Sequence, residues 1–179
     1  MLKTFAAFAV LAVNAVDLGD SDIFPHEPVD QTTDGDNPDG WVGRYGVDIS
    51  EALSSSSASC LKSYGYDWIA PRAYHSYGAV DTAACTSLRS AKGAGFSMRD
   101  VYMFPCPTCN MSAATQVNDM VTYLKNNCSA DWSGRIWLDI EGTQYWFGNY
   151  TSNRSWYQAL VTACESHTGV TCGVYASYY

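Results

Sequence analysis

The sequence predicts an α/β fold in which parallel strands alternate with helices. Short apolar segments recur along residues 44–179, and a stretch with helical periodicity follows each of the first four. This alternation implies parallel strands joined by right-handed crossovers, and hence an open sheet or a barrel. No glycine-rich phosphate loop follows the first strand, which argues against an open, doubly wound nucleotide-binding sheet.

The five expected strands are almost continuously apolar, as is typical of strands covered on both faces. They span residues 44–49, 66–74, 100–104, 135–140 and 171–177. The four helices expected between them span residues 51–64, 80–92, 112–127 and 153–167. Polar residues at three helix starts, Ser50, Ser112 and Asn153, are the predicted N-caps. The third helix is the most regular, because Val117, Met120, Val121 and Leu124 form one stripe.

We take residues 44–179 as the boundaries of this domain. Two segments precede it. Residues 1–15 have a positive start at Lys3, a short apolar run and small residues for cleavage near Ala15, which predicts a signal peptide. Residues 16–43 contain eight acidic residues and no Lys or Arg, which predicts an acidic flexible segment. From Arg44 onward, ten acidic residues face nine basic ones, so the net charge of −8 does not describe the domain. Without a basic stripe, nucleic acid is not an expected partner.

The seven cysteines fit an oxidising compartment, where disulfides persist. Because their number is odd, at least one lacks a partner within the chain. Cys106 and Cys109 form a C-x-x-C pair, which we interpret as a structural bridge rather than a redox dithiol. Four N-glycosylation sequons begin at Asn110, Asn127, Asn149 and Asn153.

The polar residues that point to function lie where strands end. Parallel α/β folds bind ligands at the carboxyl ends of their strands. The residues at those positions are Asp48, Arg72, Tyr74, Tyr102, Asp139, Glu141 and Tyr175. Aromatic rings follow the last acid, which suits binding of sugars, although rings also serve ordinary core packing.

Asp139 and Glu141 lie two positions apart, so strand geometry directs them to the same face. Two adjacent carboxylates do not both ionise easily, so one pKa should rise. We assign the proton to Glu141, which would act as the acid that protonates a glycosidic oxygen. Asp139 would position it, and Asp48 would stabilise positive charge on the sugar. An Asp-x-Glu at a strand end can equally be a surface pair or a helix cap, and three carboxylates can also hold a divalent cation.

Five segments resemble glycoside hydrolase family 25, whose members are secreted lysozymes of the Chalaropsis type. GVDIS (46–50), PRAY (71–74), WLDIEG (137–142) and GVYASYY (173–179) are similar to its first, second, fourth and fifth strands. VYMFPCPTC (101–109) resembles the third strand of its Cys-rich eukaryotic members. The resemblance implies a TIM-like (β/α) barrel with Glu141 as the acid and Asp48 and Asp139 as its acidic partners. The expected substrate-binding residues are Arg72, Tyr74, Tyr102, Phe104, Trp146 and Tyr175.

The resemblance also implies that the substrate is bacterial peptidoglycan, cut between N-acetylmuramic acid and N-acetylglucosamine, in defence or in digestion of bacteria. No metal, other cofactor or membrane anchor is expected, and we expect a monomer. The family barrel continues beyond five strands, so we expect an incomplete barrel and a chain truncated at its C-terminus. The alternative hypotheses are a chitinase-like glycosidase and a non-catalytic protein that binds cell-wall sugars. The expected location is extracellular, lumenal or lysosomal.

Overall fold

The computed structural model describes residues 45–176. The predicted signal peptide, the acidic segment and residues 177–179 lie outside this range. The strands are β1 (Gly46–Ile49), β2 (Trp68–His75), β3 (Ala79–Val80), β4 (Met98–Arg99), β5 (Val101–Met103), β6 (Arg135–Ile140) and β7 (Thr171–Ala176). The helices are α1 (Ser55–Ser63), α2 (Ala83–Gly93), α3 (Ala113–Cys128) and α4 (Tyr150–Glu165), with a short 3₁₀ helix, η1 (Thr143–Tyr145).

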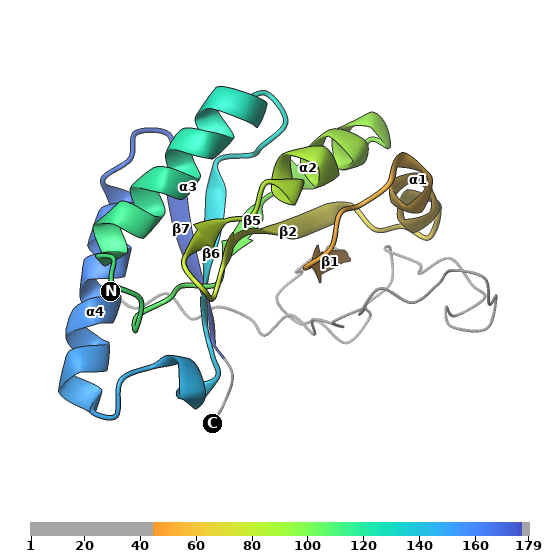
Figure 1. Cartoon of the computed structure of the whole chain (residues 1–179). Coiled ribbons are helices and arrows are strands. Elements are labelled where there is room, and N and C mark those ends of the chain that lie inside the picture. Colours follow the sequence, from red (N-terminus) through yellow and green to blue (C-terminus); the bar gives the residue numbers. More distant parts are fainter. Residues whose placement is uncertain (1–44, 177–179) are drawn as a thin grey trace, which may run out of the picture.

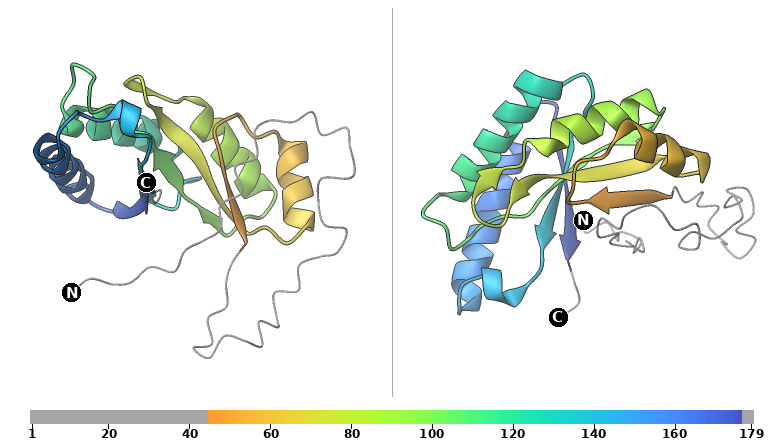
Figure 2. Two further views of the ribbon diagram at one scale, coloured as in Figure 1. Left: turned by 90° about the horizontal axis from the view of Figure 1, so that it is seen from below. Right: turned by 45° about the vertical axis from the view of Figure 1, so that its right-hand side comes forward.

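A parallel sheet with the strand order β1-β2-β5-β6-β7 forms the centre of the fold. The two-residue strand β3 pairs antiparallel with β2, and β4 pairs parallel with β2. Figure 1 shows a curved sheet with α1–α4 along one side, and Figure 2 shows the same arrangement from two further directions. The predicted α/β architecture is therefore confirmed. The described strands form an unclosed barrel, in agreement with the expected incomplete barrel.

Two predicted helix starts are wrong because other side chains provide the caps. Helix α1 begins after Ser54, whose hydroxyl accepts from the Ser57 amide, rather than after Ser50. Helix α4 begins after Asn149, whose side chain accepts from the Ser152 amide. The predicted cap Asn153 lies inside α4. The cap of α3 is Ser112, as expected.

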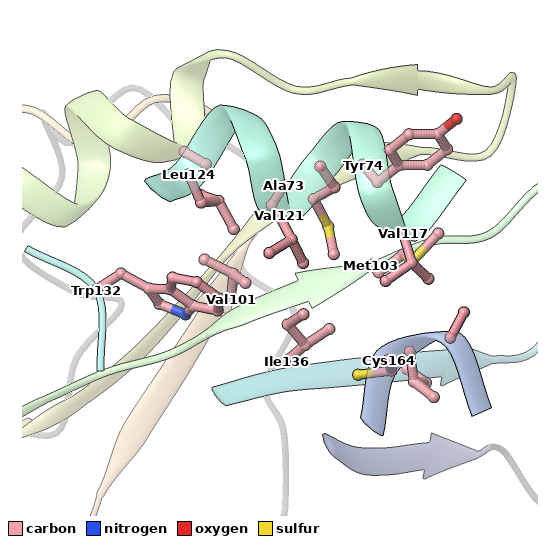
Figure 3. Packing of buried hydrophobic residues seen from close by; sticks show 14 of the residues in the cluster. Ala73, Tyr74, Val101, Met103, Val117, Val121, Leu124, Trp132, Ile136 and Cys164 are labelled. Atoms are coloured by element: carbon pink, nitrogen blue, oxygen red, sulfur yellow. The ribbon is translucent and has the colours of Figure 1, made fainter. Parts of the chain in front are cut away.

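The face of the sheet that carries the helices forms the main hydrophobic core. The predicted stripe of α3 is buried there, and it packs over strands β5 and β6. Figure 3 shows Val117, Val121 and Leu124 of α3 above Val101, Met103 and Ile136 of these strands. Burial of these apolar side chains is the main stabilising contribution to the fold.

The opposite, concave face of the sheet carries large rings and a buried carboxylate. Trp68 of β2 and Trp137 of β6 both donate their indole N–H to one oxygen of Asp100, at 2.8 and 3.0 Å. The two rings meet edge to face with centroids 6.1 Å apart. Glycines make room for them: a Cβ at Gly46 would collide with Trp68, and one at Gly173 would collide with Trp137. This layer fills the concave side below the strand ends.

Six of the seven cysteines form three disulfides, and Cys60, which is exposed, is free. Cys85–Cys128 joins α2 to α3, and Cys164–Cys172 joins α4 to β7. Cys106–Cys109 closes the turn after β5, and a Cβ at Gly78 in the β2–β3 hairpin would lie 2.9 Å from the Cys109 sulfur. This close packing supports the structural interpretation of the C-x-x-C pair. In the part of the chain described here, no helix is both long and apolar enough to span a bilayer.

Replacing Leu124 with alanine tests the packing of α3. Leu124 is completely buried, so Leu124→Ala should lower the free energy of unfolding by about 2–5 kcal/mol. The exposed Thr122 lies two residues away on the same helix, and Thr122→Ala should change it by less than about 0.5 kcal/mol. Urea unfolding followed by circular dichroism measures both. Equal effects of the two substitutions would contradict the core described above.

Candidate active site

Three carboxylates lie at the carboxyl end of the parallel sheet. Asp48 comes from β1, Asp139 from β6, and Glu141 follows β6 directly. Each interacts electrostatically with the others: the charge of Glu141 acts on both aspartates, and that of Asp48 acts on Asp139. The structure thus brings together the three acids that the sequence placed at one edge.

Burial raises the pKa of both aspartates. Asp139 is only 7% exposed, and loss of water raises its pKa to about 8, with further contributions from the negative charges of Glu141 and Asp48. Burial also raises the pKa of Asp48, although a backbone hydrogen bond opposes this effect. One oxygen of each aspartate is buried without a hydrogen-bond partner. Asp139 therefore carries a proton at neutral pH and below.

The sequence analysis expected one pKa of the Asp-x-Glu pair to rise. In the structure, the pKa of Asp139 is raised. Asp139 lies within β6, is paired with Tyr175 of β7 and is 7% exposed. Glu141 lies beyond the last residue of β6 and is half-buried. The catalytic role given to Glu141 remains a prediction, taken up below.

Tyr102 of β5 and Arg72 of β2 are paired neighbours near the carboxyl edge of the sheet, which we call the rim. Burial raises the pKa of Tyr102, the positive charge of Arg72 opposes the rise, and the charges of Asp48 and Asp139 add to it. Arg72 donates from Nε to Asp81 at 2.9 Å and from Nη2 to the carbonyl oxygen of Ser50 at 2.9 Å. Arg72 is therefore held by Asp81 and by the segment that follows Asp48.

Tyr74 was expected to bind substrate, and this expectation is wrong. The residue is 1% exposed and belongs to the helix-covered core, where burial raises its pKa to about 12 (Figure 3). The cause is a bulge in β2. Arg72 pairs with Tyr102 and Tyr74 pairs with Met103, so two residues of β2 match one of β5. A bulge re-aims the side chains that follow it, and Tyr74 turns with Met103 towards the core.

The remaining predicted substrate-binding residues have different surroundings. Tyr175 is 40% exposed, and burial together with the charges of Glu141, Asp139 and Asp48 raises its pKa, so it borders the acids. Phe104, directly after β5, is half-buried and meets the ring of Tyr145. Trp146 donates its indole N–H to the carbonyl oxygen of Glu141 at 3.1 Å, and its ring packs against Trp156 of α4.

Three residues near the site were not singled out from the sequence. Asp81, at the end of the β2–β3 hairpin, is buried and accepts hydrogen bonds from Arg72 and from the amide of Ala83. His75 Nε2 lies 3.3 Å from the Asp81 carboxylate. Tyr145 belongs to η1 and is 38% exposed beside Phe104. The sequence offered a signal only for Tyr145, which lies in the ring cluster after Glu141.

A divalent cation was the other possible use of three carboxylates. Within residues 45–176, no group of three or more His, Cys, Asp or Glu side chains has an arrangement suited to a metal ion.

A parallel sheet covered by helices, with acids gathered at its carboxyl edge, is an arrangement typical of (β/α)-barrel enzymes. The chain belongs to the family described as lysozyme-like protein 1, whose family model matches residues 42–179. It is 46% identical over 132 residues to probable GH family 25 lysozyme 2 of Dictyostelium discoideum. The aligned residues make up 74% of this chain and 60% of that protein. The resemblance to family 25 is thereby confirmed.

A second relative is lysozyme-like protein 5 of Caenorhabditis elegans, 37% identical over 140 residues, or 77% of this chain and 63% of that protein. The chain thus spans less than two thirds of these relatives. A solved structure with the same fold is the catalytic domain of endolysin ply40 from bacteriophage P40 of Listeria monocytogenes. The TM-score is 0.59 at 18% identity, and the match covers 76% of this chain and 65% of that one.

The raised pKa of Asp139 predicts a dependence of stability on pH. The group has a pKa of about 8 when folded and 3.8 as its ordinary value, so the folded state binds more protons between these values. Its contribution to stability is therefore complete below pH 4 and is lost as the pH rises through 8. Asp139→Asn cannot ionise, so its free energy of unfolding should fall less between pH 5 and pH 8.

Urea unfolding at both pH values measures this difference. The exposed aspartate of α3 provides a control, because Asp119→Asn should keep the pH dependence of the unchanged protein. If Asp139→Asn and the unchanged protein lose the same free energy over this range, Asp139 does not carry the proton.

Proposed function

We propose that this protein is a secreted lysozyme that hydrolyses the β-1,4 bond between N-acetylmuramic acid and N-acetylglucosamine in bacterial peptidoglycan. The observation that carries the proposal is the cluster of Asp48, Asp139 and Glu141 at the carboxyl edge of the sheet. Hydrolysis of a glycosidic bond requires a carboxylic acid that still holds its proton and a carboxylate that faces the developing positive charge. The relatives named as lysozymes support the choice of substrate.

In the proposed mechanism, Glu141 delivers the proton to the leaving glycosidic oxygen. Its side chain is longer than that of Asp139, and it projects from the segment after β6. Asp139, whose pKa is raised to about 8, retains a proton at neutral pH and interacts with Glu141. Asp139 would position Glu141 and tune it through this interaction. The bond between the sugar carbon and the leaving oxygen then breaks as that oxygen takes the proton, and a water molecule adds to the sugar carbon and returns a proton to the Glu141 carboxylate.

Asp48 has a different part in this mechanism. It lies on β1, at the other end of the strand order from β7, and its charge acts on Asp139. As the glycosidic bond breaks, positive charge develops on the sugar ring, and an ionised Asp48 would stabilise it. Tyr102 and Tyr175 would border the sugar, since both interact electrostatically with the acids.

Secretion is the second part of the proposal. Residues 1–15 have the pattern of a signal peptide, and three disulfides suit an extracellular or lysosomal compartment. We further propose that the protein acts as a monomer, without a cofactor, against bacterial cell walls in defence or digestion.

Replacing Glu141 tests the catalytic assignment. In the full-length protein, Glu141→Gln should reduce the turnover of peptidoglycan by about 10²- to 10⁴-fold, because the N–H groups of an amide are too weakly acidic to protonate the leaving oxygen. Loss of turbidity of bacterial walls and release of reducing ends measure the rate. The exposed Glu165, at the end of α4, allows the same exchange away from the site, and Glu165→Gln should keep full activity. Undiminished turnover by Glu141→Gln would rule out its role as the acid.

The same assay with chitin oligomers separates the proposal from the chitinase-like alternative. Faster cleavage of chitin than of peptidoglycan would favour the chitinase. Binding of wall fragments by titration calorimetry, with no cleavage by the unchanged protein, would favour the non-catalytic sugar-binding protein.

Production in a eukaryotic secretory system tests the proposed location. The protein should appear in the medium with an N-terminus near Val16, because cleavage is expected after Ala15. Titration of thiols in the native protein should find a single free thiol, that of Cys60. Intact mass measures the first point and a thiol reagent the second. A protein that stays in the cells with its N-terminus intact would contradict secretion.

A further inference from the structure

The segment after Glu141 presents one aromatic ring to solvent at the edge of the site. We infer that Tyr145, supported by Phe104, forms a stacking surface for a pyranose ring next to the sugar whose bond Glu141 protonates. This inference rests on the proposed function, because it takes the glycan of that site as the ligand. It adds a substrate-binding residue and gives Trp146 a structural role in place of the expected binding role.

Tyr145 is held close to the catalytic segment by a glycine. Gly142 follows Glu141 directly and has a φ of +67°, a conformation that glycine adopts without strain. The ring of Tyr145 packs onto this glycine, since a Cβ there would lie 2.7 Å from a ring carbon. The amide of Tyr145 also donates to the carbonyl oxygen of Gly142 at 2.9 Å. The position of the ring is therefore fixed relative to Glu141.

The two residues after Tyr145 are anchored to α4. Trp146 uses its indole N–H to bind the Glu141 carbonyl, and its ring meets Trp156 of α4 at 5.9 Å. Asn153 of α4 binds the backbone of Phe147 twice, accepting from its amide at 2.9 Å and donating to its carbonyl oxygen at 3.0 Å. Trp146 and Phe147 thus stabilise the segment, whereas Tyr145 contacts Gly142 and Phe104 and stays 38% exposed.

Phe104 connects Tyr145 to the centre of the rim. The two rings meet edge to face, with centroids 5.0 Å apart and an angle of 76° between their planes. Phe104 lies two residues after Tyr102, which interacts electrostatically with Asp48 and Asp139. Tyr145 remains 38% exposed in spite of this contact.

The chemistry of this surface suits a sugar. A pyranose offers a flat patch of C–H groups with hydroxyls around its edge, and a tyrosine offers an apolar face with one polar tip. An exposed ring beside a group of convergent polar residues is also the usual composition of a small-ligand site. The position of Tyr145, four residues after Glu141 and packed on Gly142, places such a ring next to the cleaved bond.

Binding to an inactive protein tests the inference separately from catalysis. The probe is a soluble tetrasaccharide of alternating N-acetylglucosamine and N-acetylmuramic acid, titrated calorimetrically into full-length protein carrying Glu141→Gln. Adding Tyr145→Ala should weaken binding about three- to tenfold, and adding Tyr145→Phe should leave it nearly unchanged, because the phenyl face is retained. Tyr150, which is 90% exposed at the start of α4, is the matched control, and Tyr150→Ala should have no effect.

In the otherwise unchanged protein, Tyr145→Ala should raise KM by a similar factor and leave kcat within about twofold. Thermal unfolding of each variant confirms that it is folded. Unchanged binding by Tyr145→Ala, or equal weakening by Tyr150→Ala, would overturn the inference. If the protein binds the tetrasaccharide through Tyr145 but shows no turnover, the proposed function fails and the stacking surface stands.

Discussion

The mutual repulsion of three partly buried carboxylates is the constraint around which this site is organised. Asp48 is distant in the chain from Asp139 and Glu141, and the sheet holds them where the charge of Glu141 helps to raise the pKa of both aspartates and that of Asp48 helps to raise the pKa of Asp139. Withdrawal from water makes their charges costly, so a proton remains on Asp139 up to about pH 8. Packed side chains must hold the strands that carry these carboxylates in place, because the carboxylates would otherwise move apart and relieve their repulsion.

The concave face of the sheet provides much of this support. Asp100 joins Trp68 and Trp137 through one oxygen, and these rings lie on β2 and β6. Trp137 is two residues before Asp139, and it pairs with Tyr102 of β5. The residues under the acids therefore belong to the same strands as the residues of the site. Gly46 and Gly173 are needed here for space, since any side chain at either position would collide with an indole ring.

The sequence predicted the parallel α/β fold, the α3 stripe and the edge at which the acids gather, because hydrophobic periodicity and strand direction determine these features. It did not predict the orientation of Tyr74, because a bulge that pairs two residues of β2 with one of β5 depends on contacts between strands. It also did not predict that burial raises the pKa of Asp139. Spacing shows that Asp139 and Glu141 are neighbours, but only the fold shows that Asp139 is the more deeply covered. In the proposed stacking surface, Tyr145 takes the binding role that the sequence analysis gave to Trp146, whose indole N–H is bound to the carbonyl oxygen of Glu141.

The double hydrogen bond between Asn153 and Phe147 has a consequence for processing in the secretory pathway. Asn149 and Asn153 both begin sequons, yet their side chains differ in what they already hold. Asn149 uses its oxygen to cap α4, whereas Asn153 uses its oxygen and its nitrogen together. An oligosaccharide is attached to that nitrogen, so carbohydrate and anchor compete for the same atom of Asn153. A chain glycosylated there before it folds would lose this attachment of its aromatic segment to α4, and occupancy of this single sequon would divide the protein into two populations that differ in how the segment is held.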